Sequence, residues 1–150
     1  MAPPKPQPSA YKASASHCFE SDTVDALSDG LEPTNSNDHS IPRFTWWPRQ
    51  GSTEWVQYDF ERPQKVSRVS VYWFDDTGAG SCRVPASWRL LYKSGGDWKP
   101  VEGANEYGVK KDAWNRARFP AVETTALRVE VWLLPDFSGG ILEWRLPEEE

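Results

Sequence analysis

Short segments in which apolar and polar residues alternate make up most of this 150-residue chain and constrain its fold more than any other feature. In Glu54–Phe60, for example, Val56, Tyr58 and Phe60 share one face, because side chains alternate from side to side along a strand. Turn residues recur about every 8–12 residues, and one helical turn is expected within Ser21–Leu27. The pattern predicts an all-β fold, an antiparallel β-sandwich or jelly roll. The other expected strands are Tyr11–Phe19, Lys65–Phe74, Ser87–Lys93, Trp98–Val101, Ala113–Phe119, Ala126–Leu133 and Gly140–Leu146.

The two ends of the chain differ in composition from its middle. Residues 1–11 are rich in proline and are predicted to form a stiff linker of the kind that spaces domains. Residues 12–147 suit one folded module, since a chain of this size buries about two thirds of its unfolded surface. Residues 148–150 form an acidic tail. We therefore expect a monomeric module that belongs to a longer polypeptide.

Charge and hydropathy exclude two classes of partner. The formal net charge is −5, and no stripe or cluster of Lys and Arg occurs, so we expect no nucleic-acid partner. No apolar run approaches the roughly 18 residues that cross a bilayer, so we expect no membrane insertion.

The chain has two cysteines, Cys18 and Cys82, and neither lies in a spacing typical of metal sites. The sequence leaves two alternatives open. A disulfide between them would stabilise the fold by about 4 kcal/mol in the chain-entropy picture. Alternatively, both are small buried apolar side chains.

Nine tryptophans are present, and the adjacent pair Trp46 and Trp47 is the most informative. Neighbours on an extended backbone point to opposite sides, so we expect one indole to anchor the core and the other to face outward. Pro48, Arg49 and Gly51 follow directly and are residues typical of a loop. An aromatic plate beside a guanidinium at such a junction indicates a shallow polar ligand site. The alternative is that both indoles belong to the core.

Several strings, taken in order, resemble the coagulation factor V/VIII type C, or discoidin-like, family. Glu54–Phe60 followed by Val66–Tyr72 is similar to the central pair of strands of that family. The resemblance covers roughly residues 12–146. Further matching strings are Ser28–Gly30, Trp88–Trp98, Asn115–Phe119, Leu127–Val131 and Ile141–Trp144.

This resemblance implies a galactose-binding-like jelly roll that serves as a carbohydrate-binding module of a bacterial glycoside hydrolase. Arg43–Pro48, Tyr72–Thr77 and Cys82–Trp88 look most like accessory modules beside such enzymes, including the β-L-arabinofuranosidase type. The implied partners are a plant or host glycan and the catalytic domain of the same polypeptide. The implied location is extracytoplasmic: periplasmic, cell-surface or secreted.

A structural calcium ion is expected in the long polar loop Ser28–Pro42. Calcium takes six to eight oxygen ligands, and this loop offers Asp29 beside a flexible glycine, and Asp38. In similar modules the loop meets a glutamate of the last strand, which corresponds to Glu143. The predicted ligands are therefore Asp29, Asp38 and Glu143. The alternative is that Asp29 belongs to a simple turn and Glu143 to the surface.

In similar modules the sugar binds to loops at one end of the sandwich. Sugars present apolar C–H faces rimmed by hydroxyls, which suits an aromatic plate with Arg and Asp beside it. We expect the loops 46–51, 75–83 and 135–140 to converge there. The predicted sugar-binding residues are Trp46, Trp47, Arg49, Asp75, Asp76, Arg83 and Phe137. Two alternatives remain for these residues. The Phe137 side chain could fold back over the end of the sandwich and cover it, and Asp75 and Arg83 could form a salt bridge.

An enzymatic role is not expected. Adjacent residues such as Asp75 and Asp76 rarely place their carboxylates on opposite sides of one glycosidic bond. His17 and His39 have no Ser or Cys partner at a recognisable spacing. Two other functions remain: a structural spacer that packs on a catalytic neighbour, and a discoidin-like domain that binds protein or phospholipid. The second normally needs basic loop tips, whereas this chain is acidic.

Overall fold

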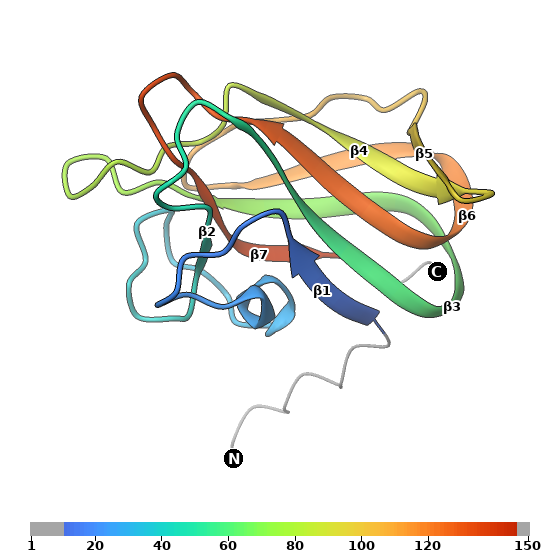
Figure 1. Cartoon of the computed structure of the whole chain (residues 1–150), viewed down its shortest axis with the longest axis horizontal. Helices are drawn as coiled ribbons and strands as arrows, with labels where there is room; N and C mark the ends of the chain where they lie inside the picture. Colours follow the sequence, from blue (N-terminus) through green and yellow to red (C-terminus); the bar gives the residue numbers. More distant parts are fainter. Residues whose placement is uncertain (1–10, 147–150) are drawn as a thin grey trace, which may run out of the picture.

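The computed structural model describes residues 11–146, which fold into an antiparallel β-sandwich (Figure 1). One 3-10 helix, η1 (Val24–Ser28), follows the first strand, and the side chain of Thr23 caps it. The all-β fold and the single helical turn predicted from the sequence are confirmed. The predicted linker, apart from Tyr11, and the acidic tail lie outside the described residues. The strands are β1 (Tyr11–Ala15), β2 (Phe44–Thr45), β3 (Thr53–Phe74), β4 (Ser87–Ser94), β5 (Asp97–Pro100), β6 (Trp114–Trp132) and β7 (Gly140–Arg145).

Strands β3 and β6 pass through both sheets of the sandwich. In one sheet, residues 53–59 of β3 lie between β1 and residues 126–132 of β6, and β4 and β5 continue outward. In the other, the second half of β3 lies between β7 and the first half of β6, and β2 pairs with β7. Register shifts after Asp59 and after Val66 mark the place where the pair bends. Figure 1 shows this bend at the right of the view.

The sequence pattern predicts a turn at Glu61–Gln64 that separates two strands, and a similar break between residues 119 and 126. Both predictions are wrong in this detail, because strand structure continues through each bend as β3 and β6. The sequence pattern also predicts a hairpin turn at Ser94–Asp97, and this prediction is confirmed, because Ser94 pairs with Asp97. Gly95 and Gly96 there have φ of 59° and 91°, the left-handed conformation that a two-residue hairpin loop requires.

Both ends of the described chain lie toward the bend. Tyr11 at the start of β1 pairs with Phe60. Strand β7 starts where Gly140 pairs with Phe74, far from the bend, and runs to Arg145, which pairs with Ser70 (Figure 1).

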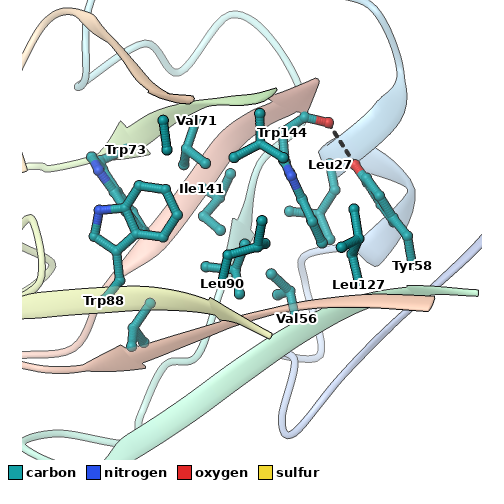
Figure 2. Close-up of a cluster of buried hydrophobic side chains, with 14 of the residues drawn as sticks. Leu27, Val56, Tyr58, Val71, Trp73, Trp88, Leu90, Leu127, Ile141 and Trp144 are labelled. Atoms are coloured by element: carbon teal, nitrogen blue, oxygen red, sulfur yellow. Dashed lines mark hydrogen bonds between the residues drawn. The ribbon is translucent and has the colours of Figure 1, made fainter. Parts of the chain in front are cut away.

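Aromatic side chains dominate the core between the sheets (Figure 2). Tyr58 stacks on Trp144 with ring centroids 3.8 Å apart, and its hydroxyl donates to the Trp144 carbonyl at 2.7 Å. The indoles of Trp73 and Trp88 both donate to the Gly108 carbonyl, at 3.1 and 2.8 Å. These two indole N–H groups thus share one backbone acceptor, which reduces the cost of placing them in an apolar interior. The Trp144 N–H, in contrast, is buried without a partner among the described residues.

The two cysteines are free thiols, Cys18 half-buried and Cys82 buried. The sequence leaves open whether Cys18 and Cys82 form a disulfide, and in the structure they do not. Burial, followed by the charge of Asp76, raises the pKa of Cys82 to about 12. Within residues 11–146, no helix is long and apolar enough to span a membrane.

We expect Tyr58→Phe to lower the free energy of unfolding by about 1–2 kcal/mol. The substitution keeps the ring stacked on Trp144 but removes the hydroxyl that donates to its buried carbonyl. Urea unfolding followed by far-UV circular dichroism measures the change. Tyr92→Phe is the matched control, because the half-buried Tyr92 makes no such bond within residues 11–146, and it should change stability by less than about 0.5 kcal/mol. Equal effects of the two substitutions would contradict this role of the Tyr58 hydroxyl.

Candidate functional site

Three loops converge at the end of the sandwich opposite the bend, and we call this region the loop end (Figure 1). Backbone hydrogen bonds join them: Trp46 N donates to Gly139 O at 3.0 Å, and Ser138 N donates to Ser81 O at 2.9 Å. The predicted convergence is confirmed. The three loops are residues 46–51, 75–83 and 135–140.

A pocket of about 350 Å³ lies at the loop end, and we call it the end pocket. Two of the residues predicted to bind sugar, Trp47 and Asp76, line it. The other lining residues come from the segment after β1, from β2 and the residue before it, from the end of β3 and from the loop after β3. They are Phe19, Asp22, Arg43, Thr45, Phe74, Gly80, Ser81 and Cys82.

The segment around β2 divides its side chains strictly between core and pocket. Arg43, Thr45 and Trp47 line the end pocket, whereas Phe44 and Trp46 are fully buried on the other side. Trp46 packs edge-on against Phe44, with ring centroids 5.1 Å apart, and is inaccessible to a ligand. The expectation that one indole of the pair faces inward and one outward is confirmed, and the assignment of Trp46 to the sugar site is wrong.

Arg43 is the centre of a polar network on the pocket wall. Its Nε lies 3.5 Å from Asp22 Oδ1, and its guanidinium carbon lies 4.9 Å from the centre of the Phe74 ring. Its Nη1 donates to His39 Nδ1 at 2.7 Å. Asp22 also accepts a hydrogen bond from Thr45 Oγ1. These contacts hold the guanidinium flat against the wall and leave its Nη2 without an acceptor among the described residues.

Asp76 and Arg83 order the loop after β3. Asp76 Oδ1 accepts from Cys82 N at 2.8 Å and lies 3.6 Å from Arg83 Nη1. The Arg83 guanidinium also lies 4.4 Å from the centre of the Phe137 ring. Arg83 and Phe137 are therefore packed against each other, and neither lines the end pocket. The sequence assigns both to a sugar site, and that assignment stays a prediction.

Arg49 and Asp75 also have structural partners and lie outside the pocket lining. Arg49 Nη1 pairs with Oε1 of the buried Glu54 at 3.0 Å. Asp75 is 3% exposed and accepts from Thr77 N and Val84 N at 3.0 and 3.1 Å. The assignment of Asp75 to a sugar site is wrong, because its carboxylate is buried and satisfies backbone N–H groups of the loop. Arg49 is about half exposed, and its assignment stays a prediction.

Two of the three predicted metal ligands meet. Burial, followed by the neighbouring Asp29 carboxyl group, raises the pKa of Glu143 to about 8. Glu143 Oε2 accepts from Gly30 N at 3.1 Å and from Arg145 Nε at 3.2 Å. Within the described part of the chain, Glu143 Oε1 and Asp29 Oδ2 are buried without any partner. Carboxylate oxygens are the ligands that Ca²⁺ prefers, and the assignment of Asp29 and Glu143 as metal ligands stays a prediction.

Asp38 does not join that pair. Its Oδ2 accepts from Thr34 N and Thr34 Oγ1 at 3.0 and 3.1 Å, and its Oδ1 accepts from Ser40 N and Ser40 Oγ at 2.9 and 2.5 Å. Among residues 11–146, no group of three or more His, Cys, Asp or Glu side chains is placed to hold a metal. Asp38 is an organiser of the loop, and its assignment as a ligand is wrong because all its acceptor capacity is used locally.

Sequence reasoning missed four important residues of the end pocket: Phe19, Asp22, Arg43 and Phe74. Arg43 could have been found, because the alternation that puts Trp47 outward also puts Thr45 and Arg43 on the same side. Phe74 follows by the same rule from the inward Trp73. Phe19 and Asp22 gave no such signal, since they lie in the irregular segment between β1 and η1.

Among known protein families, residues 12–142 match the model of the F5/8 type C domain.

Similar solved structures have the same fold at low sequence identity. A chain from the Streptococcus pneumoniae beta-galactosidase BgaA is 22% identical, with a TM-score of 0.78 and 91% of each chain covered. The family 32 CBM from C. perfringens NanJ, in complex with galactose, is 12% identical, with a TM-score of 0.69, covering 91% of this chain and 93% of that one. Chitosan-binding module 2 from Paenibacillus sp. IK-5, in complex with chitotriose, is 16% identical, with a TM-score of 0.64, covering 93% and 97%.

We expect Asp38→Asn to destabilise the protein in a pH-dependent way. Hydrogen bonds from Ser40 and Thr34 hold the pKa of Asp38 well below its ordinary value of 3.8. A depressed pKa stabilises the folded state above the unfolded-state pKa, and the stabilisation is lost as the pH falls through the folded-state value. The stability gap between wild type and variant should be constant above about pH 5 and narrow below about pH 4.

Urea unfolding of both proteins between pH 7 and pH 3 measures this gap. Asp97 is exposed, so Asp97→Asn should have the same free energy of unfolding as the wild type at every pH. A gap for Asp38→Asn that widens on acidification would contradict the assigned role of the carboxylate.

Proposed function

This chain belongs to the F5/8 type C domain family, and from that premise we propose that it is a non-catalytic carbohydrate-binding module whose ligand site is the end pocket. The observation that carries the proposal is the side chain of Trp47, which lines that pocket beside Arg43 and Asp76. A sugar ring needs an apolar plate for its C–H face and polar groups at its rim, and these three residues supply both.

Each lining group has a defined task in this proposal. The Trp47 indole stacks on the ring face. Arg43 Nη2, which has no acceptor among residues 11–146, donates to a sugar oxygen. Asp76 Oδ2, which has no donor there, accepts from a hydroxyl. Arg43 is already held by Asp22 and Phe74, so little side-chain entropy is lost on binding.

Relatives support this assignment. Structures of the same fold include one in complex with galactose, one with GalNAc-beta-1,3-galactose and one with chitotriose. In our proposal the module serves a glycoside hydrolase on the same polypeptide, in an extracytoplasmic location of a bacterium. Binding raises the local concentration of the enzyme on a plant or host polysaccharide, so weak single-site affinity suffices.

A structural calcium ion is part of the proposal. Asp29 Oδ2 and Glu143 Oε1 would provide two carboxylate ligands, and backbone carbonyls of the loop 28–42 and water would complete an oxygen shell. The ion would supply positive charge beside the two carboxyl groups, and its binding would displace a proton from Glu143, whose pKa is raised to about 8. It would thereby tie the loop to β7 without taking part in sugar binding.

We expect Trp47→Ala to weaken glycan binding at least about tenfold, because the stacking plate is lost. Affinity electrophoresis on immobilised galactan, arabinan and chitosan identifies a retained glycan, and calorimetry gives the affinity ratio. Trp98→Ala is the matched control: Trp98 is also a half-buried tryptophan, but it lies in β5 at the other end of the molecule (Figure 1).

Equal binding by wild type and a folded Trp47→Ala variant would remove the end pocket as the ligand site. If no glycan is retained by the wild type, the alternative of a structural spacer that packs on a catalytic neighbour takes its place.

We expect about 1 mM CaCl₂ to raise the melting temperature of the EDTA-treated protein by on the order of 5 °C, because a ligand that binds only the folded state stabilises it. Glu143→Gln should abolish this rise, since one of the two anionic ligands is lost. Glu123→Gln, an exposed carboxylate on β6, should retain it. Differential scanning fluorimetry measures all three, and an identical rise in Glu143→Gln would refute the proposed ligand.

A further inference from the structure

Carboxylates outnumber cations among the residues that line the end pocket. Asp22 and Asp76 are both lining residues, and Arg43 is the one cationic side chain among them. A pocket lined in this way discriminates between ligands by their charge as well as by their shape.

The charge of Arg43 is already balanced by the protein. Its nearest carboxylate, Asp22, is 5% exposed and lies 3.5 Å away. An arginine has no acceptor atom, so the 2.7 Å contact with His39 is a donation from Arg43 Nη1 to an unprotonated Nδ1. The opposite nitrogen of His39 contacts Asn37 Oδ1 at 2.7 Å, which matches a neutral ring with its proton on Nε2. The imidazole therefore adds no positive charge beside Arg43.

One carboxylate oxygen of Asp76 has no partner among the described residues. The nearest cation of Asp76 is Arg83, and Arg83 Nη1 also donates to the carbonyls of Gly80 and Cys82 at 2.8 Å each. That nitrogen lies 3.6 Å from Asp76 Oδ1, longer than a hydrogen bond, and Oδ2 has no donor among the described residues. Oδ2 instead lies against Gly80, where the methyl group of an alanine would come within 2.2 Å of it. A glycine thus leaves room for an unpaired carboxylate oxygen at the pocket.

Resting on the proposed sugar-binding function, we propose that the end pocket selects its ligand by charge, accepting neutral sugars and amino sugars and rejecting sugars that carry a carboxylate or sulfate. A ligand anion would have to compete with Asp22 for Arg43 while lying close to Asp76. A ligand ammonium group would instead find an acceptor in Asp76 Oδ2. Repulsion between like charges at a partly desolvated site is an effective means of discrimination.

The test compares sugars of one ring configuration that differ in one substituent and its charge. The probes are the methyl glycosides of galactose, galactosamine and galacturonic acid, with the corresponding glucose series, titrated into the full chain at pH 7 and followed by NMR. We expect the uronic acid to bind at least about tenfold more weakly than the neutral sugar of its series, and the amino sugar at least as tightly. Raising NaCl from about 20 to about 500 mM should reduce both differences in affinity, because the shorter Debye length screens the interaction between the charged ligand and the pocket.

Two substitutions locate the effect. Asp76→Asn should reduce the ratio of the two affinities, that for the neutral sugar over that for the uronic acid, at least about threefold. Asp97→Asn changes the net charge equally, but lies in the exposed hairpin between β4 and β5 at the opposite end of the molecule (Figure 1), and it should leave the difference intact.

Equal affinity of the wild type for neutral sugar and uronic acid overturns the inference and leaves the proposed function standing. An equal reduction of the affinity ratio by both substitutions also overturns the inference, because the preference would then depend on the net charge of the protein and not on the pocket. Failure of every sugar in both series to bind contradicts the proposed function itself, and the inference falls with it.

Discussion

The structure depends on the hydrogen bonding between β3 and β6, which continues from one sheet into the other through the bend near residues 60–66. Because both long strands cross over together, the two sheets are held face to face by the backbone as well as by the core. Their far ends, and the loops that follow them, are consequently brought to the same end of the sandwich. The end pocket exists because of this arrangement, since its residues are supplied by segments far apart in the sequence.

Side-chain alternation determines what each segment contributes at that end. Around β2, and at the end of β3, both faces of the backbone are buried, one by the core and the other by the loop 28–43 and the pocket wall. Tyr72 and Phe74 therefore pack on the side opposite to Val71 and Trp73. A continuous apolar run in this fold does not identify which face is the core, and that explains why Trp46 and Trp47, so similar in sequence, have such different environments.

The all-β class, most strand positions and the convergence of three loops could be predicted, because alternation and turn chemistry are local signals. The contact between Asp29 and Glu143 could be inferred from family resemblance, although the two residues are far apart in the chain. Local signals could not separate charged residues that face a pocket from those that satisfy buried atoms. Asp75, Asp76 and Asp38 look alike in sequence, and their roles depend on tertiary hydrogen bonds. The continuity of β3 through residues 61–64 was also out of reach, since Pro63 normally indicates a break.

The positions of Tyr11 and Arg145 have a consequence for the orientation of the whole module. Both ends of the described chain leave from the side of the bend, whereas the loops that line the end pocket lie at the other extremity (Figure 1). A covalent neighbour at either terminus would thus attach on the side away from those loops. In such an arrangement the loops would stay accessible to a large insoluble ligand.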